Sequence, residues 1–369
     1  MATANPFRPT FGVSPPVVAG RYDLIEEFKI GLQEGPGAPA RASLYLGPRG
    51  SGKTVLLNEL EDVARAEGWH VVSETASPGL IDRLVGEHLP ALLAELDPRQ
   101  ISTRLKDASA FGVGIGWERD EQHVVRPGLR SQLTLLTDVI GEQQLAAGVL
   151  LTVDEIHGGT TAELRELATT VQHCFREQRP LAIAVAGLPA AVHERLLDDQ
   201  VLTFFRRADR HHLGSVDLDD VAEAIEQPVV AAGKAIDADA LEAAAAATRG
   251  YPFMIQMVGW QLWRAAGSAA TITMAMVRRA VPVAVRRMGE LVHEPALADL
   301  SRGDQAFLAA MATDDGPSRT GELARRMDVD DNWISQYRRR MIDAEIIRPI
   351  RRGEFDFELP YLREYLRAK

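Results

Sequence analysis

The sequence contains a single cysteine, Cys174, among 369 residues. One thiol excludes an intrachain disulfide and any metal site built from several cysteines. Long apolar runs are missing too, since the best candidate, residues 181–192, is broken by Gly187 and Pro189 and is shorter than the roughly 18 residues that a bilayer span needs. The amino terminus also lacks the basic and apolar regions of a secretory signal. We therefore expect a cytoplasmic protein with no membrane partner.

A basic excess is absent as well. The net charge is −11 at pH 7. Residues 301–369 hold 13 Arg and Lys and 13 Asp and Glu, so the acidity lies in the first 300 residues. An acidic body disfavours general attraction to nucleic acid, whereas a neutral terminal segment with clustered arginines is compatible with local contact. The content of 46% hydrophobic and 25% charged residues is that of a folded globular protein.

Glycine, by contrast, gathers in the segment GPRGSGKT between an apolar strand, 42–46, and an amphipathic helix, 54–67. This segment matches the pattern G-x-x-x-x-G-K-[ST] in the context that the pattern requires. Its backbone N–H groups can converge on phosphate, Lys53 can reach the β- and γ-phosphates, and the Thr54 hydroxyl suits Mg²⁺. A glycine-rich connection that binds nothing is the alternative. The sequence predicts a site for ATP and Mg²⁺ made by Gly47, Pro48, Arg49, Gly50, Ser51, Gly52, Lys53 and Thr54.

A second apolar strand, 149–153, ends in two acids, Asp154 and Glu155. Asp154 is placed to hold the magnesium ion through its water shell, together with Thr54. Glu155 is suited to polarise the attacking water. For His157 nearby, solvation or capping is the simpler interpretation. We expect Glu155 to act in catalysis and Asp154 to bind the metal.

Short apolar strands alternate with helices in the first part of the chain, at 42–46, 70–75, 149–153, 181–186 and 210–216. This alternation predicts a parallel sheet covered on both faces. Period-2 glycines in 111–117 indicate an inserted β-hairpin at about 108–125. After residue 217 the expected elements are helices, at 218–232, 238–248, 252–266 and 272–290.

The last segment predicts a helix-turn-helix followed by a wing. Helices are expected at 305–311, 320–327 and 332–344, and strands near 346–349 and 354–357. Buried positions on the second helix leave polar side chains outward, able to contact bases and phosphates of duplex DNA. A winged helix that docks protein instead is the alternative. The candidate DNA contacts are Ser335, Gln336, Arg339, Arg340, Arg351 and Arg352.

The chain resembles the AAA+ branch of P-loop ATPases, in particular origin-recognition-type initiators and related STAND-like ATPases. The resemblance covers nearly the whole length and is carried by VVAGRYDLIEEF (17–28), GPRGSGKT, LLTVDEIH (150–157), FFRRADRHHL (204–213), GYPFMIQMVG (250–259) and FELPYLREYL (357–366). It implies a P-loop core at 41–216, a helical lid at 217–294 and a winged helix at 295–369. Residues 1–40 would form an arm and an adenine-side box.

The resemblance also assigns roles to single residues. Gly20 and Arg21 match the box that lines the adenine pocket, and Pro252 lies in the turn that brings the lid onto the nucleotide. Arg206 or Arg207 stands at the position of an arginine finger, which implies a homo-oligomer in which this residue completes a neighbouring site.

Two departures from the family pattern concern hydrolysis. The fourth strand ends in Ala186-Gly187 without a polar sensor residue, and no lid arginine follows Gly250-Tyr251-Pro252, so that Arg249 is the one nearby substitute. We expect a slow ATP hydrolase that switches between ATP and ADP states and is coupled to DNA. The alternative is a STAND-like regulatory ATPase whose winged helix binds a regulatory protein. A small-molecule kinase fits less well, because no acceptor-binding constellation is present.

Overall fold

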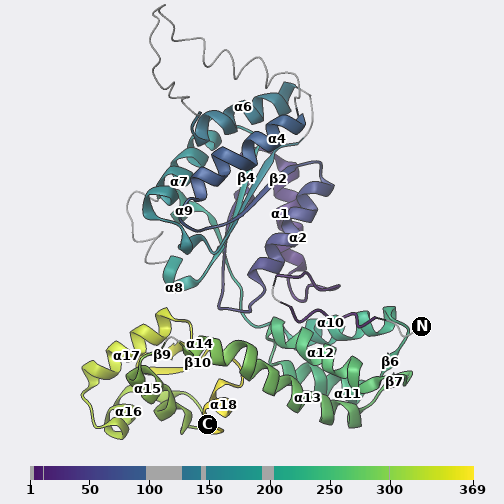
Figure 1. Cartoon of the computed structure of the whole chain (residues 1–369), viewed down its shortest axis with the longest axis vertical. Coiled ribbons are helices and arrows are strands. Elements are labelled where there is room, and N and C mark those ends of the chain that lie inside the picture. The colour runs from purple at the N-terminus through teal and green to yellow at the C-terminus, as the bar shows by residue number, and fades with distance from the viewer. Residues whose placement is uncertain (1–3, 11, 97–126, 143–146, 193–202, 299) are drawn as a thin grey trace, which may run out of the picture.

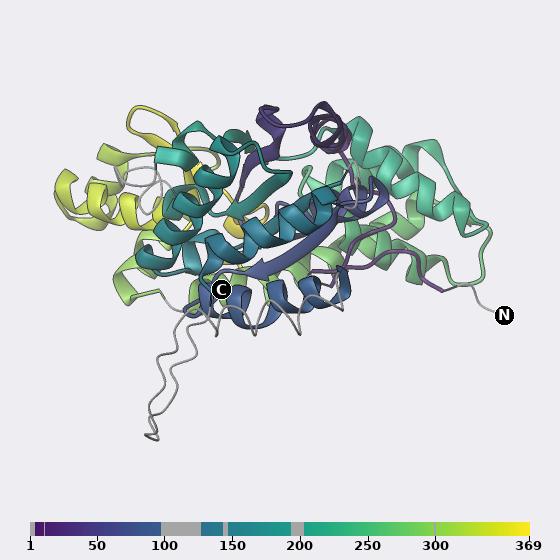
Figure 2. The same ribbon diagram turned by 90° about the horizontal axis from the view of Figure 1, so that it is seen from above.

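The structure is a computed structural model that describes residues 4–10, 12–96, 127–142, 147–192, 203–298 and 300–369. The hairpin expected at about 108–125 lies outside these residues. Within them, no helix is both long and apolar enough to cross a lipid bilayer. The chain forms an α/β unit, a helical unit (residues 218–298) and a C-terminal unit (residues 300–369). Figure 1 shows the α/β unit above the other two, and Figure 2 shows those two extending to opposite sides.

The α/β unit is built on five parallel strands in the order β2-β3-β4-β1-β5. The expected strands are confirmed, the fifth being shorter and starting one residue earlier than expected. Their bounds are β1 Ala42–Leu46, β2 His70–Thr75, β3 Val149–Asp154, β4 Leu181–Gly187 and β5 Asp209–His212. In this order β4 lies between the strand before the glycine-rich segment and the strand that ends in Asp154. All three strand ends therefore meet at one edge of the sheet.

Helices cover both faces of this sheet. One face is covered by α1 and α2, and the other by the remaining helices. On β4 the large residues Leu181, Ile183 and Val185 face the second side, and alanines at the alternate positions face α2. The small alanine side chains let α2 pack closely on the sheet. The helices are α1 Tyr22–Glu34, α2 Lys53–Ala66, α3 Leu80–Arg83, α4 Leu89–Leu96, α6 Leu129–Glu142, α7 Thr161–Arg176, α8 Pro189–Val192 and α9 Thr203–Arg207, with the short helical turns η1 Pro39–Arg41, η2 Leu84–His88 and η3 Ile156–Gly158.

The helical unit contains the four expected helices and differs from the expectation in one respect. Two short strands pair in parallel within it, where none was expected. Two-residue strands carry no periodic pattern, which is why the sequence does not reveal them. The elements are α10 Leu218–Ala231, β6 Ala235–Ile236, α11 Ala238–Thr248, α12 Pro252–Ala266, β7 Thr271–Ile272, α13 Met274–Met288, η6 Gly289–His293 and α14 Glu294–Ala298. The run from α13 to α14 is continuous across 294–295, and the division placed there stays a prediction.

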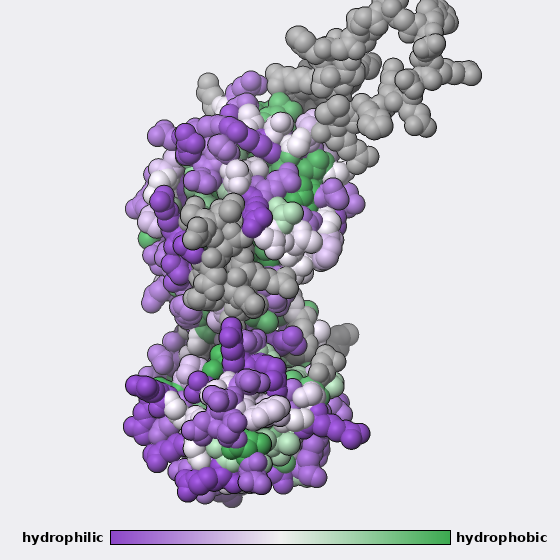
Figure 3. Space-filling model, turned by 90° about the vertical axis from the view of Figure 1, so that its left-hand side faces the viewer, coloured by the Kyte–Doolittle hydropathy of each residue, from purple (hydrophilic) through white to green (hydrophobic). Residues whose placement is uncertain are grey.

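The C-terminal unit combines helices with a three-stranded sheet in the order β8-β10-β9, in which β10 pairs antiparallel with both neighbours. Its apolar core is continuous with that of the helical unit. Whether it works as a winged helix stays a prediction. The elements are α15 Arg302–Ala312, β8 Ser318–Arg319, α16 Thr320–Met327, α17 Asp331–Asp343, β9 Ile347–Arg351, β10 Glu354–Phe357 and α18 Leu362–Arg367. On the face seen in Figure 3 the surface of this unit is mostly hydrophilic with small apolar patches.

The N-terminal arm ties the units together. Phe7 is buried in the core of the helical unit, where a Cβ on Gly259 would lie 2.3 Å from its ring. Further along, Asn58 on α2 donates a hydrogen bond to the Gly12 carbonyl at 3.3 Å. The arm therefore runs from the helical unit to the helix that follows the glycine-rich segment.

Candidate functional site

The glycine-rich segment forms the turn between β1 and α2 that the sequence predicts. Gly50 and Gly52 have φ of 73° and 88°, in the left-handed region where glycine carries no Cβ penalty. Ser51 N–H donates to the Pro48 carbonyl at 3.2 Å, which closes the loop. The first turn of α2 begins at Lys53, so its free N–H groups point out of the loop. This geometry is suited to hold an anion.

Lys53 is 6% exposed and bends back over this loop. Its ammonium donates to the carbonyls of Gly47 at 2.7 Å and Pro48 at 3.1 Å. Burial lowers the pKa of Lys53, and the nearby carboxylates of Glu155, Glu345 and Asp154 oppose that shift. Glu345 belongs to the C-terminal unit, so an acid distant in sequence shares the electrostatic surroundings of this lysine.

Thr54 and Asp154 come together as predicted. The Thr54 hydroxyl donates to the Asp154 carboxylate at 2.5 Å, across 100 residues of sequence. A second link holds the same two elements, because the Thr152 hydroxyl of β3 donates to the buried Glu61 of α2 at 2.5 Å. The hydroxyl and the carboxylate are the oxygen ligands that Mg²⁺ prefers. The residues present therefore fit a magnesium ion.

Glu155 follows directly and lines the cavity beside the loop. Its backbone is left-handed, with φ of 49°, and its N–H donates to Asp154 at 2.8 Å. Its carboxylate lies 3.2 Å from Nε2 of His157. The expectation of a merely solvated or capping His157 therefore misses this contact, which orients the Glu155 side chain.

The end of β4 has no room for the polar sensor that the sequence lacks. A Cβ on Gly187 would lie 2.6 Å from Val192 and 2.9 Å from Ile156. Nδ1 of His157 would be 3.5 Å from the same point. The packing of α8 and η3 against the end of β4 therefore leaves no space for a side chain at position 187.

The cavity beside the loop has a volume of about 660 Å³, within the usual range for small-molecule sites. Arg49, Lys53, Thr54 and Pro252 line it, as expected, and so does Arg21. Arg21 donates to the Gly214 carbonyl at 2.8 Å, and burial lowers its pKa against the attraction of Asp220. Gly20 is next to this wall but is not among the lining residues. The remaining walls come from the N-terminal arm, the start of α12 and the C-terminal unit.

The helical unit contacts the loop directly through a residue that the sequence did not single out for chemistry. The Tyr251 hydroxyl donates to the Arg49 carbonyl at 2.5 Å. A Cβ on Gly50 would lie 2.1 Å from that hydroxyl, so Tyr251 is seated where only glycine leaves space. Arg249 does not turn toward the phosphate loop. Its guanidinium lies 3.8 Å above the Tyr361 ring and pairs with Glu364 in the C-terminal unit.

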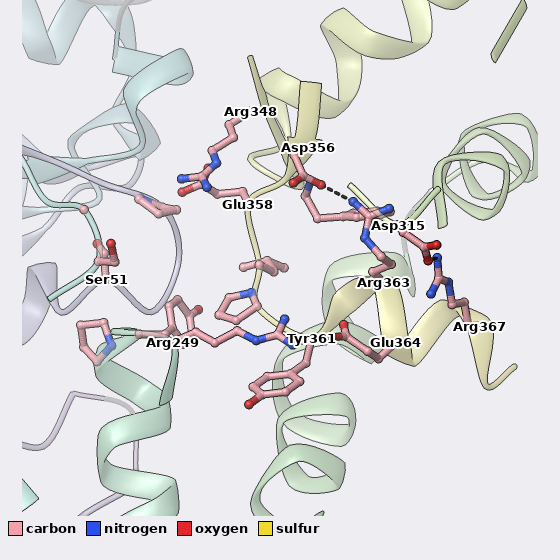
Figure 4. A pocket seen from close by; sticks show the side chains of 18 residues that line it. Ser51, Arg249, Asp315, Arg348, Asp356, Glu358, Tyr361, Arg363, Glu364 and Arg367 are labelled. Carbon is pink, nitrogen blue, oxygen red and sulfur yellow. Dashed lines mark hydrogen bonds and ion pairs between the residues drawn. The ribbon is translucent and has the colours of Figure 1, made fainter. Parts of the chain in front are cut away.

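A second cavity of about 470 Å³ lies on the other side of Tyr251, between the loop and the C-terminal unit. Figure 4 shows Ser51 on one side and charged residues of both signs on the other. Most of these charges are paired, as in Arg363 with Asp356 and Arg348 with Glu358 at 3.7 Å. The loop is therefore flanked by two cavities, and only the first contains Lys53 and Glu155.

The predicted arginine finger lies away from this chain's own cavity. Arg206 and Arg207 are exposed at the end of α9, just before β5. Because β5 runs parallel to β1, the start of β5 is at the opposite edge of the sheet from the glycine-rich loop. Neither residue lines either cavity beside the loop.

The six candidate DNA contacts differ in how their side chains are engaged. Arg340 donates two hydrogen bonds to Asp304 at 3.0 and 2.6 Å and stacks on Tyr337. Arg351 is bonded twice to Glu354, at 2.5 and 2.8 Å, and the Ser335 hydroxyl donates to the Asp331 carbonyl. The exposed candidates without such a bond in the described part of the chain are Gln336, Arg339 and Arg352.

Three solved structures resemble the whole chain at low identity. The Walker-type ATPase of Pyrococcus abyssi has a TM-score of 0.64 at 16% identity, and the match covers 95% of this chain and 96% of that one. The ORC2 protein of Aeropyrum pernix gives 0.62 at 14%, with 98% and 96% covered. Cdc6p of Pyrobaculum aerophilum gives 0.51 at 15%, also with 98% and 96% covered.

Sequence comparisons add little to this. Residues 290–366 match the family model of a domain of unknown function, DUF8462. No curated protein matches the chain. At these identities the structural likeness establishes the fold, and it confirms the resemblance at that level. The chain has the α/β fold of the P. abyssi Walker-type ATPase and the A. pernix ORC2 protein.

Proposed function

We propose that this protein binds ATP with Mg²⁺ in the cavity beside the glycine-rich loop and hydrolyses it slowly, as an ATP/ADP switch. The observation that carries the proposal is the hydrogen bond between Thr54 and Asp154 at 2.5 Å, next to the buried Lys53. Two segments 100 residues apart thereby place a hydroxyl, a carboxylate and an ammonium at one edge of the sheet. The A. pernix ORC2 protein was solved as ADPNP and ADP complexes, which supports a nucleotide site in this fold.

Each residue of the site then has a defined task. Lys53 exchanges the Gly47 and Pro48 carbonyls for phosphate oxygens, while the loop N–H groups bind the same phosphates. Thr54 and Asp154 hold Mg²⁺, which neutralises phosphate charge when bound. Glu155 takes a proton from the attacking water, and His157 keeps its carboxylate oriented. Hydrolysis is slow because β4 supplies no polar group at its end.

The substitution Lys53→Ala tests this function. We expect it to weaken the binding of ADP and of ATPγS by about 100-fold or more, because it removes the charge-assisted hydrogen bonds to phosphate. Isothermal titration measures the affinity. The matched control is Lys234→Ala, since Lys234 also donates to two backbone carbonyls, including Gly267 at 2.9 Å, but in the helical unit. Equal affinities in the wild type and Lys53→Ala would refute the proposal.

Two kinds of partner are candidates for a protein that switches between ATP and ADP states, namely duplex DNA and a regulatory protein. Exposed Gln336, Arg339 and Arg352 favour contact with duplex DNA, whereas the pairing of Arg340 and Arg351 within the unit favours a docked protein. We propose DNA contact through the exposed side chains first. Titration of duplex DNA at two salt concentrations tests it, with the double variant Arg339→Glu and Arg352→Glu and with Arg325→Glu on α16 as the control. DNA binding that survives both charge reversals would contradict DNA contact through these side chains, and so would the absence of salt-dependent binding. Either result would favour a protein partner.

Oligomerisation enters the same proposal through the exposed end of α9. Arg206 and Arg207 lie at the sheet edge opposite their own loop, which favours a role at a neighbouring copy of the chain. We propose that one of them stabilises phosphate charge in that copy.

A further inference from the structure

Glu345 occupies a backbone position that suits glycine. Helix α17 closes with two hydrogen bonds, from Ile346 N–H to the Met341 carbonyl at 3.0 Å and from Glu345 N–H to the Ile342 carbonyl at 2.9 Å. These bonds form the Schellman closure, in which the residue after the cap is left-handed and usually glycine. Here that residue is Glu345, with φ of 57°. A left-handed conformation is unfavourable for an L-residue that carries a Cβ.

The side chain of Glu345 is unfavourably placed as well. The residue is 7% exposed, and both of its carboxylate oxygens are buried without a hydrogen-bond partner among the described residues. A buried carboxylate without partners destabilises a fold by several kcal/mol unless another group compensates it. Two unfavourable features in one residue indicate a role other than stability.

The surroundings of Glu345 show where that role lies. It lines the cavity of about 660 Å³ together with Lys53, Arg49 and Glu155. Burial raises the pKa of Glu345, and the positive charges of Lys53 and Arg49 oppose the rise, while Glu358 and Glu155 add to it. The C-terminal unit thus places one carboxyl group among the charges that would meet the phosphates.

We propose that Glu345 makes this cavity discriminate between nucleotides by phosphate charge, so that the wild-type protein favours ADP over ATP. The proposal rests on the nucleotide site proposed above. Lys53 is the group expected to meet the terminal phosphates, and Glu345 competes with them for the same ammonium. Each additional negative charge close to a carboxylate raises the energy of the complex, and the effect is large where water is excluded. ATP carries one phosphate more than ADP and is disfavoured more.

The location of Glu345 connects this discrimination to a change of shape. The carboxylate is fixed to the C-terminal end of α17, and its backbone has no freedom to turn away without opening the Schellman closure. Movement of α17 with the C-terminal unit would take the carboxylate away from the phosphates. ATP binding and the position of this unit oppose each other, and by linkage a partner that displaces the unit strengthens ATP binding.

The test compares the affinities for ATPγS and ADP in the wild type, Glu345→Gln and Glu345→Gly. Isothermal titration is done at the alkaline end of the range in which the protein is stable, where Glu345 is most fully charged. Glycine relieves the left-handed backbone, and both variants remove the buried carboxylate, so neither is expected to lower the unfolding temperature. The matched control is Asp356→Asn, an acid of the same unit that lines the other cavity and pairs with Arg363.

We expect both Glu345 variants to shift the affinity ratio toward ATPγS by about tenfold, which a charge interaction of about 1.4 kcal/mol produces, and Asp356→Asn to leave it unchanged. An unchanged ratio in the Glu345 variants, or an equal gain for both nucleotides, would overturn the proposal while nucleotide binding itself stands. Binding of neither nucleotide by the wild type would refute the proposed function, and this inference with it.

Discussion

The helical unit and the C-terminal unit both border the glycine-rich loop, but through side chains of opposite kinds. The Tyr251 hydroxyl is neutral, donates to the Arg49 carbonyl and fits the space above Gly50. The Glu345 carboxyl is ionisable, buried and without a hydrogen-bond partner in the described part of the chain. A satisfied neutral contact is indifferent to charge in the cavity, whereas a carboxylate responds to it. The difference suggests that one unit shapes the loop and the other senses what the loop holds.

The strongest way to break this comparison is Gly50→Ala. The Cβ of this alanine would lie 2.1 Å from the Tyr251 hydroxyl, and the alanine would have to adopt the φ of 73° that Gly50 has. We expect nucleotide affinity to fall by about 100-fold, because loop and tyrosine must both shift by an ångström or more. Isothermal titration with ADP measures it.

Gly68→Ala is the control for the strain alone. Gly68 has a φ of 81°, and a Cβ there would meet nothing within 4 Å. It should lose about 1 kcal/mol of stability and keep its affinity. Equal nucleotide affinities in the two alanine variants would show that the contact between Gly50 and Tyr251 does not affect nucleotide binding.

The sequence predicts the half of the site that depends on local pattern. The glycine-rich loop between β1 and α2, and the acids at the end of β3, each follow from a strand and its neighbouring residues. Parallel pairing then forces Thr54 and Asp154 together, because both lie at carboxyl ends of strands in one sheet. The strand alternation predicts the sheet for the same reason.

The other half of the site depends on contacts between distant segments. Tyr251 and Arg49 are 202 residues apart, and no periodicity relates them. Glu345 reads in sequence as an ordinary acid after a helix, and only its left-handed φ and burial mark it out. Arg340 fits an outward DNA-reading pattern, but Asp304, 36 residues away, takes up its guanidinium. Tertiary pairing of this sort leaves no local signal.

A smaller effect concerns the contact between the helical unit and the C-terminal unit at His293. His293 at the end of η6 is buried, lies 2.9 Å from the Pro360 carbonyl and stacks edge-on to Tyr365. Burial lowers its pKa to about 4, against the opposing effects of that hydrogen bond and Glu364. The folded protein therefore keeps His293 neutral where the unfolded chain, with the usual value of 6.5, takes up a proton.

The sign of the pH effect follows. Between pH 6.5 and about 4 the unfolded state binds more protons, so this group's contribution to stability is present above pH 6.5 and is lost as the pH falls. The loss is at most about 1.4 kcal/mol per pH unit. Thermal unfolding across this range should show a steeper decline for the wild type than for His293→Gln, which stays neutral and can still donate to Pro360. Parallel profiles would mean that this contact does not titrate.

The smallest expected effect sharpens the comparison most directly. Tyr251→Phe removes one neutral hydrogen bond and keeps the ring, so we expect a loss of about 1 kcal/mol in stability and a modest, equal change in affinity for ADP and ATPγS. The exposed Tyr22→Phe is the control and should change neither. Thermal unfolding and titration with both nucleotides measure the outcome. A shift in the ADP-to-ATPγS preference on removing this hydroxyl would assign phosphate discrimination to the helical unit too, and the division between a shaping contact and a sensing one would fail.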